Sequence, residues 1–339
     1  MPSLLEIKDL VTVFDTQRGR IKAVDGVSLK VQSGETLGIV GESGCGKTML
    51  ALSIMRLIPA NGRIINGRIL FRGEDLLNLS SEQIRAKRGS EMAMIFQEPM
   101  TSLNPVFRIG DQIAEAVMLH QNIPANEALA LSIEQLREVG IPDPERRARD
   151  YPHQLSGGMR QRVMIAMAMS CHPVLLLADE PTTALDVTIQ AQILDLIAEL
   201  QKKNKMAVVL ITHDLGVIAQ TAAHVAVMYA GKIMESAPVE KIFAAPLHPY
   251  TQGLIDSMPV WCGDDGAGRS RRLNTISGSV PSLYNLVAGC RFYERCMHAH
   301  AGCSTEEPQL VEAQPGHFVA CSNINIRSGK KEIQSGMDL

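Results

Sequence analysis

Residues 41–48 read GESGCGKT and match the pattern G-x-x-x-x-G-K-[ST]. In this pattern the glycines let backbone N–H groups wrap nucleotide phosphates, the lysine reaches the β and γ phosphates, and the hydroxyl residue ligates Mg²⁺. The alternative is a glycine turn before an ordinary helix. An apolar run precedes the stretch and a helical sequence follows it, so we expect ATP to bind here. The predicted ATP-binding residues of this stretch are Gly41, Ser43, Gly44, Cys45, Gly46, Lys47 and Thr48.

Two adjacent acids, Asp179 and Glu180, follow an apolar run further along the chain. An aspartate at the end of a strand can hold the Mg²⁺ shell, and the adjacent glutamate can polarise a water molecule. Two such acids could also be solvated loop charges. Together with the phosphate motif they indicate hydrolysis, so we predict Thr48 and Asp179 as Mg²⁺ ligands and Glu180 as the general base.

The elements that must position these residues are predicted by unbroken apolar runs. Residues 36–41, 174–178 and 207–211 read as buried strands, with helices expected over 47–57 and 188–200. Strands without alternation are typical of parallel sheets covered on both faces. The fold class is therefore α/β. Several further strands are expected over residues 4–41, and apolar positions at helical spacing predict a helical insertion over about residues 100–172.

Residues 155–162 read LSGGMRQR and stand shortly before Asp179. A serine and two glycines at this point could be a simple helix N-cap. The stretch is similar to the signature of ABC ATPases, however. Gln97 lies before it, and residues 184–186 (ALD) and His213 lie after it, in that family's order. The resemblance implies a P-loop ABC ATPase core with an antiparallel β subdomain and a helical subdomain.

The resemblance also implies a shared nucleotide site, in which two subunits sandwich two ATP molecules. Ser156, Gly157 and Gly158 of one subunit would face the phosphate loop of the other. Phe14 lies where the family often places an aromatic ring under the adenine, although it could equally be a buried strand residue.

Roles for the remaining motif residues come from the same resemblance. Glu180 would orient and deprotonate the attacking water, His213 would contact the γ-phosphate, and Gln97 would sense the metal and the water. The predicted catalytic residues are Lys47, Gln97, Glu180 and His213, with Gln97 also beside the Mg²⁺.

Longer stretches indicate a branch of the family. Residues 94–105 (MIFQEPMTSLNP), 151–154 (YPHQ) and 248–252 (HPYTQ) resemble the D-type ATPase subunit of bacterial dipeptide and oligopeptide permeases. We therefore expect an ATPase that powers peptide import. The ATPases of nickel, glutathione and antimicrobial-peptide importers share much of this sequence, so these cargoes stay open as alternatives. A non-transport ABC ATPase, or a binding module with a vestigial ATPase, is a further alternative.

Within this branch the resemblance implies three kinds of partner: a second, non-identical ATPase subunit, two membrane permease subunits, and an extracytoplasmic substrate-binding protein. The net charge is -3, and without a long basic stretch we expect no nucleic acid partner. The start of the chain does not resemble a signal peptide. No apolar segment approaches the roughly 20 residues that cross a bilayer. The expected location is peripheral, on the cytoplasmic face of the inner (plasma) membrane.

Cysteines gather in the last quarter of the chain, where Cys290, Cys296, Cys303 and Cys321 follow the spacing C-x5-C-x6-C-x17-C. Structural disulfides are not expected in a reducing compartment. A structural Zn²⁺, a [4Fe-4S] cluster and four unconnected thiols compete, and the C-x2-C knuckles of most zinc sites are absent. The resemblance to peptide-permease ATPases implies the cluster, with Cys262 left out.

The predicted domains are an ABC ATPase domain over residues 1–259, a small irregular Cys-rich domain over 260–325 and a polar tail over 326–339. The cysteines lie far along the chain from the phosphate motif, so we expect them to have a structural or docking role. His298, His300 and His317 are expected at the surface rather than as ligands.

Overall fold

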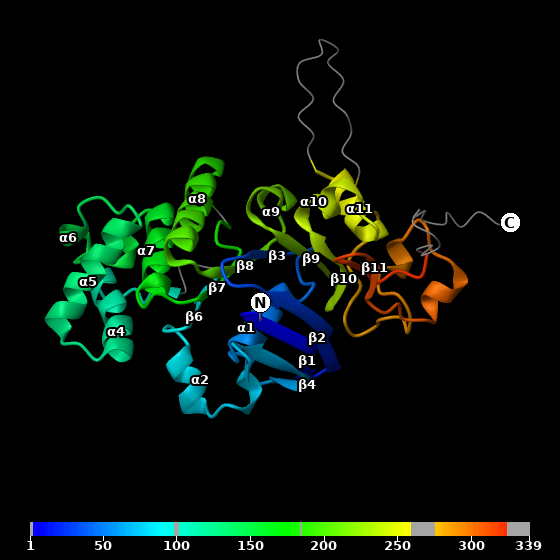
Figure 1. Cartoon of the computed structure of the whole chain (residues 1–339), viewed down its shortest axis with the longest axis horizontal. Helices are drawn as coiled ribbons and strands as arrows, with labels where there is room; N and C mark the ends of the chain where they lie inside the picture. Colours follow the sequence, from blue (N-terminus) through cyan, green and yellow to red (C-terminus); the bar gives the residue numbers. More distant parts are fainter. Residues whose placement is uncertain (1–2, 98–101, 184, 259–274, 324–339) are drawn as a thin grey trace, which may run out of the picture.

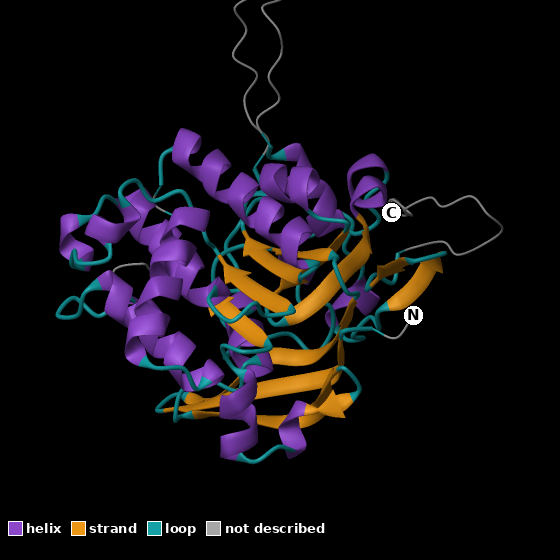
Figure 2. Cartoon of the chain, turned by 60° about the vertical axis from the view of Figure 1, so that its left-hand side comes forward, coloured by secondary structure: helices purple, strands orange, loops and turns teal. Residues whose placement is uncertain are grey.

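The computed structural model describes residues 3–97, 102–183, 185–258 and 275–323, which are centred on an eight-stranded sheet. Within this sheet the order β9-β3-β8-β7-β6 is parallel throughout. These strands are β3 (Thr36–Val40), β6 (Met92–Ile95), β7 (Leu175–Asp179), β8 (Ala207–Thr212) and β9 (His224–Tyr229). The expected α/β core with parallel strands is confirmed (Figure 2).

The parallel strands lack alternation because both of their faces are covered. In β8, Val208 and Leu210 belong to one buried apolar cluster, whereas Val209 and Ile211 belong to the other. Each cluster removes one face of the sheet from water, so every position along the strand gains from an apolar side chain.

Three antiparallel strands extend the same sheet beyond β9. They are β10 (Lys232–Pro238), β12 (His317–Val319) and β11 (Val311–Gln314). Glu235 of β10 lies opposite Val319 of β12. The C-terminal part of the chain is thus continuous with the sheet that carries the phosphate motif (Figure 1).

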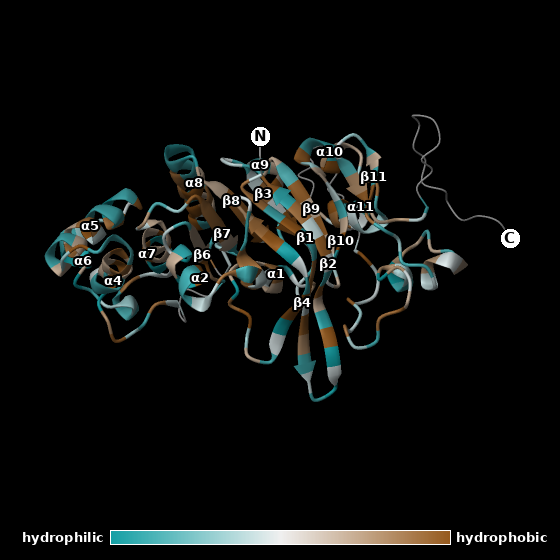
Figure 3. Cartoon of the chain, turned by 60° about the horizontal axis from the view of Figure 1, so that its bottom comes forward, coloured by the Kyte–Doolittle hydropathy of each residue, from teal (hydrophilic) through white to brown (hydrophobic). Residues whose placement is uncertain are grey.

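A second, antiparallel sheet has the order β2-β1-β4-β5. Its strands are β1 (Leu5–Thr16), β2 (Gly19–Val31), β4 (Gly62–Phe71) and β5 (Glu74–Asp75). Helix α1 (Lys47–Ile54) buries Leu50 and Ile54 in one cluster with residues of both sheets. The ends of β1, β2 and β4 project from the body of the molecule (Figure 3).

Helices α4 to α7 pack at one end of the molecule, beyond β6 and β7 (Figure 1). They are α4 (Ile109–Gln121), α5 (Ala125–Glu138), α6 (Pro144–Arg147) and α7 (Gly157–Met169). Ile109, Ile113 and Leu136 are buried in the cluster that also covers one face of the main sheet. All four helices lie within about residues 100–172, the range over which the helical insertion is predicted.

The remaining helices flank the main sheet or the second sheet. They are α2 (Ser81–Lys87), α8 (Val187–Asn204), α9 (Leu215–Thr221), α10 (Val239–Ala244) and α11 (Pro249–Asp256). None of the helices in the described parts of the chain is both long and apolar enough to cross a membrane.

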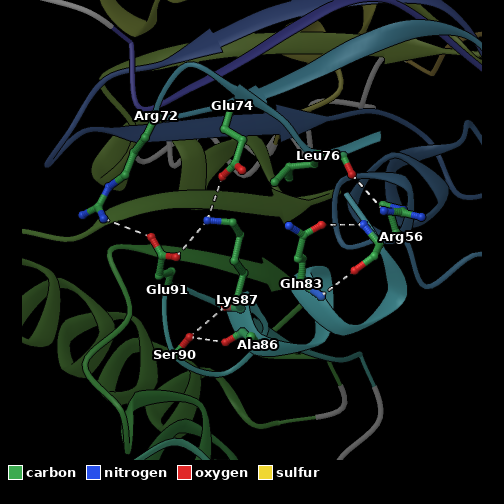
Figure 4. A network of polar contacts seen from close by, with 10 residues as sticks. Arg56, Arg72, Glu74, Leu76, Gln83, Ala86, Lys87, Ser90 and Glu91 are labelled. Carbon is green, nitrogen blue, oxygen red and sulfur yellow. Dashed lines mark hydrogen bonds and ion pairs between the residues drawn. The ribbon is translucent and has the colours of Figure 1, made fainter. Parts of the chain in front are cut away.

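Exposed ion pairs join α2 to the second sheet (Figure 4). Lys87 Nζ lies 3.0 Å from a carboxylate oxygen of Glu74 and 3.1 Å from one of Glu91. Arg72 lies 3.0 Å from the other Glu91 oxygen. Such exposed pairs contribute little to stability, typically about 0 to 1 kcal/mol each.

The described C-terminal segment, residues 275–323, is largely irregular, with short 3₁₀ turns at Tyr293–Arg295 and Ala301–Ser304. The prediction that His317 lies at the surface is wrong. Its side chain is fully buried, with Nε2 2.6 Å from Glu235 Oε1. The pairing of β12 with β10 brings the two side chains together, which sequence position alone does not reveal.

Candidate functional site

The phosphate-binding loop connects β3 to α1, and two of its glycines are required by close backbone packing. Gly46 caps α1 with φ 105°, a left-handed conformation that favours glycine. A Cβ on Gly46 would overlap the carbonyl oxygen of Ala23, and one on Gly41 would overlap that of Met228. The predicted strand, glycine loop and helix are therefore present in the arrangement that the phosphate motif needs.

Lys47 is almost fully buried at the first position of α1. Its Nζ donates to the carbonyl oxygens of Gly41 at 2.7 Å and Glu42 at 3.0 Å. Cys45 is fully buried beneath the loop, and burial raises the pKa of its thiol more than nearby Lys47 lowers it. A thiol kept protonated in this way fits a packing role.

Asp179 ends β7 beside the loop, with 1% of its surface exposed. Burial raises the pKa of Asp179 and the charge of Glu180 adds to this effect, while a hydrogen bond with Thr48 and the charge of Lys47 lower it. Oδ1 of Asp179 is buried and has no hydrogen-bond partner among the described residues. An orphaned carboxylate oxygen next to the Thr48 hydroxyl is the oxygen donor set that Mg²⁺ prefers.

Glu180 follows in the left-handed region, with φ 45°. A non-glycine residue in this region is uncommon and such backbone strain clusters at functional sites. Its Oε2 accepts from Thr183 Oγ1 at 2.8 Å and from Gln97 Nε2 at 3.2 Å, and His213 Nδ1 lies 3.3 Å from Oε1. The structure thus brings together the predicted Gln97, Glu180 and His213.

The electrostatics of Glu180 favour the charged form of its carboxyl group. Burial alone would raise the pKa of this carboxyl, but hydrogen bonds from Thr183 and His213 and the charge of Lys47 outweigh burial and lower it. The carboxylate is therefore ionised at neutral pH. Thr183 is a site residue that sequence reasoning missed, since a threonine in a loop after the acids has no signal of its own.

The signature residues lie away from this cluster. Ser156 caps α7, its Oγ accepting from Met159 N at 3.3 Å, and Gly157 begins that helix. Helix α7 belongs to the helical end of the molecule, whereas the phosphate loop precedes α1 near the centre (Figure 1). Within one chain, Ser156, Gly157 and Gly158 do not complete the phosphate site.

Phe14 lies near the end of β1, opposite Gly62 of β4. Its ring packs where a Cβ on Gly62 would stand, and only 8% of the residue is exposed. This burial matches the alternative of a packed strand residue. The adenine role of Phe14 stays a prediction.

The four C-terminal cysteines line one narrow cavity together with His248, Phe292 and Asn323. Burial raises the pKa of Cys290 to about 12 and that of Cys321 to about 11. Among the described residues, no three His, Cys, Asp or Glu side chains converge closely enough to hold a single metal ion. Cys262 lies outside the described residues.

The cysteine segment lies far along the chain from the phosphate motif but contacts the phosphate loop in the folded protein. Arg295, which precedes Cys296, forms a two-pronged ion pair with Glu42 of the phosphate loop, at 2.7 and 3.0 Å. Sequence separation concealed this contact, because it depends on how the irregular segment packs against α11 and β9.

Two family models match the chain: one described as ABC transporter over residues 24–183, and one described as oligopeptide/dipeptide transporter, C-terminal region, over residues 234–303. The second match begins inside β10 and includes Cys290, Cys296 and Cys303.

Relatives match almost the whole chain. The protein y4tR of Sinorhizobium fredii, named as a probable peptide ABC transporter ATP-binding protein, is 54% identical over 323 residues, or 95% of each chain. The dipeptide transport ATP-binding protein DppD of Escherichia coli is 48% identical over 319 residues, covering 94% of this chain and 96% of DppD. Among solved structures, the dimeric MJ0796, described as a bacterial ABC transporter cassette, aligns with a TM-score of 0.62 at 25% identity. That alignment covers 69% of this chain and 98% of MJ0796.

Proposed function

The chain belongs to the ATP-binding proteins of ABC transporters, and we propose that its ATPase drives the import of dipeptides or oligopeptides through separate permease subunits. The observation that supports peptides as the cargo is the match of residues 234–303 to the oligopeptide/dipeptide transporter C-terminal region. The names of the relatives point the same way. Importers of nickel, glutathione or antimicrobial peptides remain the alternatives within the family, and a non-transport ATPase is disfavoured.

Hydrolysis follows from the cluster around the phosphate loop. Loop N–H groups and Lys47 bind the phosphates, and Glu180 takes a proton from the water that attacks the γ-phosphorus in line with the leaving oxygen. Thr48 and Asp179 would hold Mg²⁺, which supplies charge neutralisation to the phosphates when it is bound. The contacts of Gln97 and His213 with Glu180 hold the base in place.

The nucleotide site is completed by a second subunit. Ser156 and Gly157 are exposed at the start of α7, away from the loop of their own chain. The solved relative MJ0796 is described as dimeric. We infer that the partner is a non-identical ATPase and that the pair docks under two permease subunits on the cytoplasmic face of the membrane. A substrate-binding protein outside the cell would deliver the cargo.

Reconstituted transport tests this function. The subunit, co-expressed with a second ATPase and two permease subunits from its own genome, is placed in proteoliposomes with the matching binding protein and a labelled dipeptide. We expect ATP-dependent uptake, and little hydrolysis by the isolated subunit. The Lys47→Ala variant controls for leak. Uptake of nickel or glutathione but not of peptides would overturn the cargo, and robust activity of the isolated subunit would overturn the requirement for a partner.

The cysteine cavity is proposed to hold a [4Fe-4S] cluster within a small C-terminal domain, about residues 260–325. Four thiols on one cavity supply the donor set, with the ligands Cys290, Cys296, Cys303 and Cys321. A cluster is held through four separate irons, so its cysteines stand further apart than the sulfurs around one Zn²⁺, where each Zn–S bond is about 2.3 Å. The spacing of these cysteines lacks the C-x2-C knuckles of most zinc sites, which favours the cluster over zinc.

Iron and zinc analysis separates the alternatives. Protein purified without oxygen should be brown, absorb near ~400 nm and contain about four irons per chain. Colourless protein with one zinc, or with no metal, would overturn the cluster. Neither result tests the ATPase assignment, because none of these cysteines lies in the phosphate motif.

A further inference from the structure

Glu42, the second residue of the phosphate loop, is held by a side chain from the cysteine segment. Both guanidinium Nη atoms of Arg295 contact the Glu42 carboxylate, one oxygen each, at 2.7 and 3.0 Å. The Arg295 side chain is only 6% exposed and that of Glu42 25%. A two-pronged arginine–carboxylate pair of this kind is directional and is stronger than a neutral hydrogen bond.

Arg295 is itself fixed before it reaches the loop. Its guanidinium lies 5.8 Å from the ring centres of both Tyr229 and Phe292, and its Nε donates to the Ser277 carbonyl at 2.9 Å. Burial alone would lower the pKa of Arg295, but its hydrogen bonds to Glu42 and Tyr229 outweigh burial and raise it. Because the guanidinium group of Arg295 is already held in place, little side-chain entropy is lost when it binds the Glu42 carboxylate.

The backbone of Glu42 is tied at two more points. Its N–H donates to the hydroxyl of Tyr250, from α11, at 3.0 Å. Its carbonyl accepts from Lys47 Nζ at 3.0 Å. The position of Glu42 therefore sets where the ammonium group that must meet the phosphates is held.

A second arginine of the same segment reaches the loop by another route. Arg291 pairs with the buried carboxylate of Asp25 and donates to the carbonyl of Ala230. The next residue, Gly231, donates its N–H to the carbonyl of Cys45 in the phosphate loop at 2.8 Å. The segment from Cys290 to Cys296 thus contacts the loop directly at Glu42, and it is linked to Cys45 indirectly through Ala230 and Gly231.

We propose that Arg295 is a positioning residue for ATP binding, which holds the phosphate-binding loop through Glu42 and so couples the cysteine segment to nucleotide affinity. This rests on the proposed ATPase function of the loop. An anchored loop presents its N–H groups already ordered, so the ordering entropy is not lost when ATP binds. Without Arg295 the loop must be ordered by the nucleotide itself, and affinity falls.

The test compares Arg295→Ala, Glu42→Gln and the double variant in the full chain. Arg72→Ala is a matched control, because Arg72 also lies 5.8 Å from an aromatic ring, that of Phe71, and pairs with a glutamate, Glu91, away from the loop (Figure 4). A fluorescent ATP analogue reports affinity, and urea unfolding reports stability.

Arg295→Ala should weaken nucleotide binding at least about tenfold, raising KM of the assembled transporter more than it lowers kcat. Glu42→Gln should show a similar loss, and the double variant should be no worse than Arg295→Ala because the two residues act as one unit. Arg72→Ala should bind as the unaltered protein does. Unchanged affinity in Arg295→Ala would overturn the proposal. A loss confined to Arg295→Ala and matched by lower stability would also overturn it, as a merely structural effect.

Hydrogen exchange gives a readout that does not depend on ATP. In nucleotide-free protein, Arg295→Ala should speed exchange in residues 41–48 while leaving α4 and α5 unchanged. Equal protection in the variant and the unaltered protein would refute the anchoring itself. If instead the unaltered protein failed to bind ATP, the proposed function would fall, while exchange would still decide whether Arg295 orders the loop.

Discussion

Gln97 donates a hydrogen bond from its side-chain amide to Glu180 Oε2, at 3.2 Å across 83 positions of sequence. Gln97 follows β6 and Glu180 follows β7, and these strands are parallel neighbours in the sheet. The carboxyl ends of parallel strands meet at one edge, where ligands bind in such folds. A residue from the loop just before the helical insertion thereby contacts Glu180.

Replacing Glu180 by Gln should abolish turnover and spare ATP binding. The amide keeps the shape and can still contact Thr183, but it cannot accept a proton from water. We expect hydrolysis by the assembled transporter to fall at least ~100-fold, with a closed ATP-bound pair accumulating. The exposed substitution Glu74→Gln, away from the site, should leave the rate unchanged. Near-normal phosphate release by Glu180→Gln would remove Glu180 from this role.

Replacing Gly46 by Ala should eliminate nucleotide binding for two reasons. The new Cβ would overlap the carbonyl oxygen of Ala23, and the φ of 105° is unfavourable for any residue but glycine. Gly73→Ala separates the two causes. Gly73 has φ 84° and nothing within 4 Å of the position that a Cβ would take, so it carries only the conformational cost, about 1 to 2 kcal/mol. Urea unfolding should show that cost for Gly73→Ala with unchanged ATP affinity. Equal affinities in the two variants would contradict the close approach at Gly46.

Much of the phosphate site was predictable because its residues are set by local chemistry. The spacing of Gly41, Gly46 and Lys47 fits one loop geometry, and the unbroken apolar run before Asp179 predicts a buried parallel strand. Strand order then places Gln97 and Glu180 together. The family resemblance supplied the roles predicted for Gln97 and Glu180, which the residues alone do not determine.

The contacts of the C-terminal segment were not predictable, because an irregular chain has no periodicity from which its packing follows. An arginine in an irregular segment is usually a solvent-exposed charge, but Arg295 packs against two aromatic rings and pairs with Glu42. His317 was likewise predicted at the surface, yet its side chain is buried beside Glu235. Short strands such as β12, with three residues, give too little pattern to predict their partner.

A pH dependence follows from His248, which caps α11. Its Nδ1 accepts the N–H of Tyr250 at 3.0 Å, so the cap needs a neutral ring. Burial lowers the pKa of His248 to about 4, although the charge of Glu235 acts to raise it. In the unfolded chain the pKa of His248 is about 6.5, so as the pH falls the unfolded chain takes up this proton before the folded protein does. The free energy of unfolding therefore decreases as the pH falls from about 6.5 to about 4.

The measurement is the urea midpoint as a function of pH. Between about pH 7 and about pH 5 the unaltered protein should lose roughly 2 kcal/mol through this group. His248→Asn keeps an N-capping oxygen but does not titrate, so it should flatten that part of the profile. Identical profiles for the two proteins would show that His248 does not control stability in this range.

Replacing Cys296 by Ser should affect both the cysteine cavity and the distant nucleotide. Cys296 lines the cavity and directly follows Arg295, so losing a ligand there loosens the turn Tyr293–Arg295 that carries the guanidinium to Glu42. We expect less iron per chain and weaker binding of a fluorescent ATP analogue, by about threefold to tenfold if the pair is only partly released. Cys171→Ser is the matched control, a thiol in the helical end of the molecule that should change neither value. Loss of iron with unaltered ATP affinity would show that the cavity and the phosphate loop are independent, and would confine the role of Arg295 to an anchor that does not respond to the cysteines.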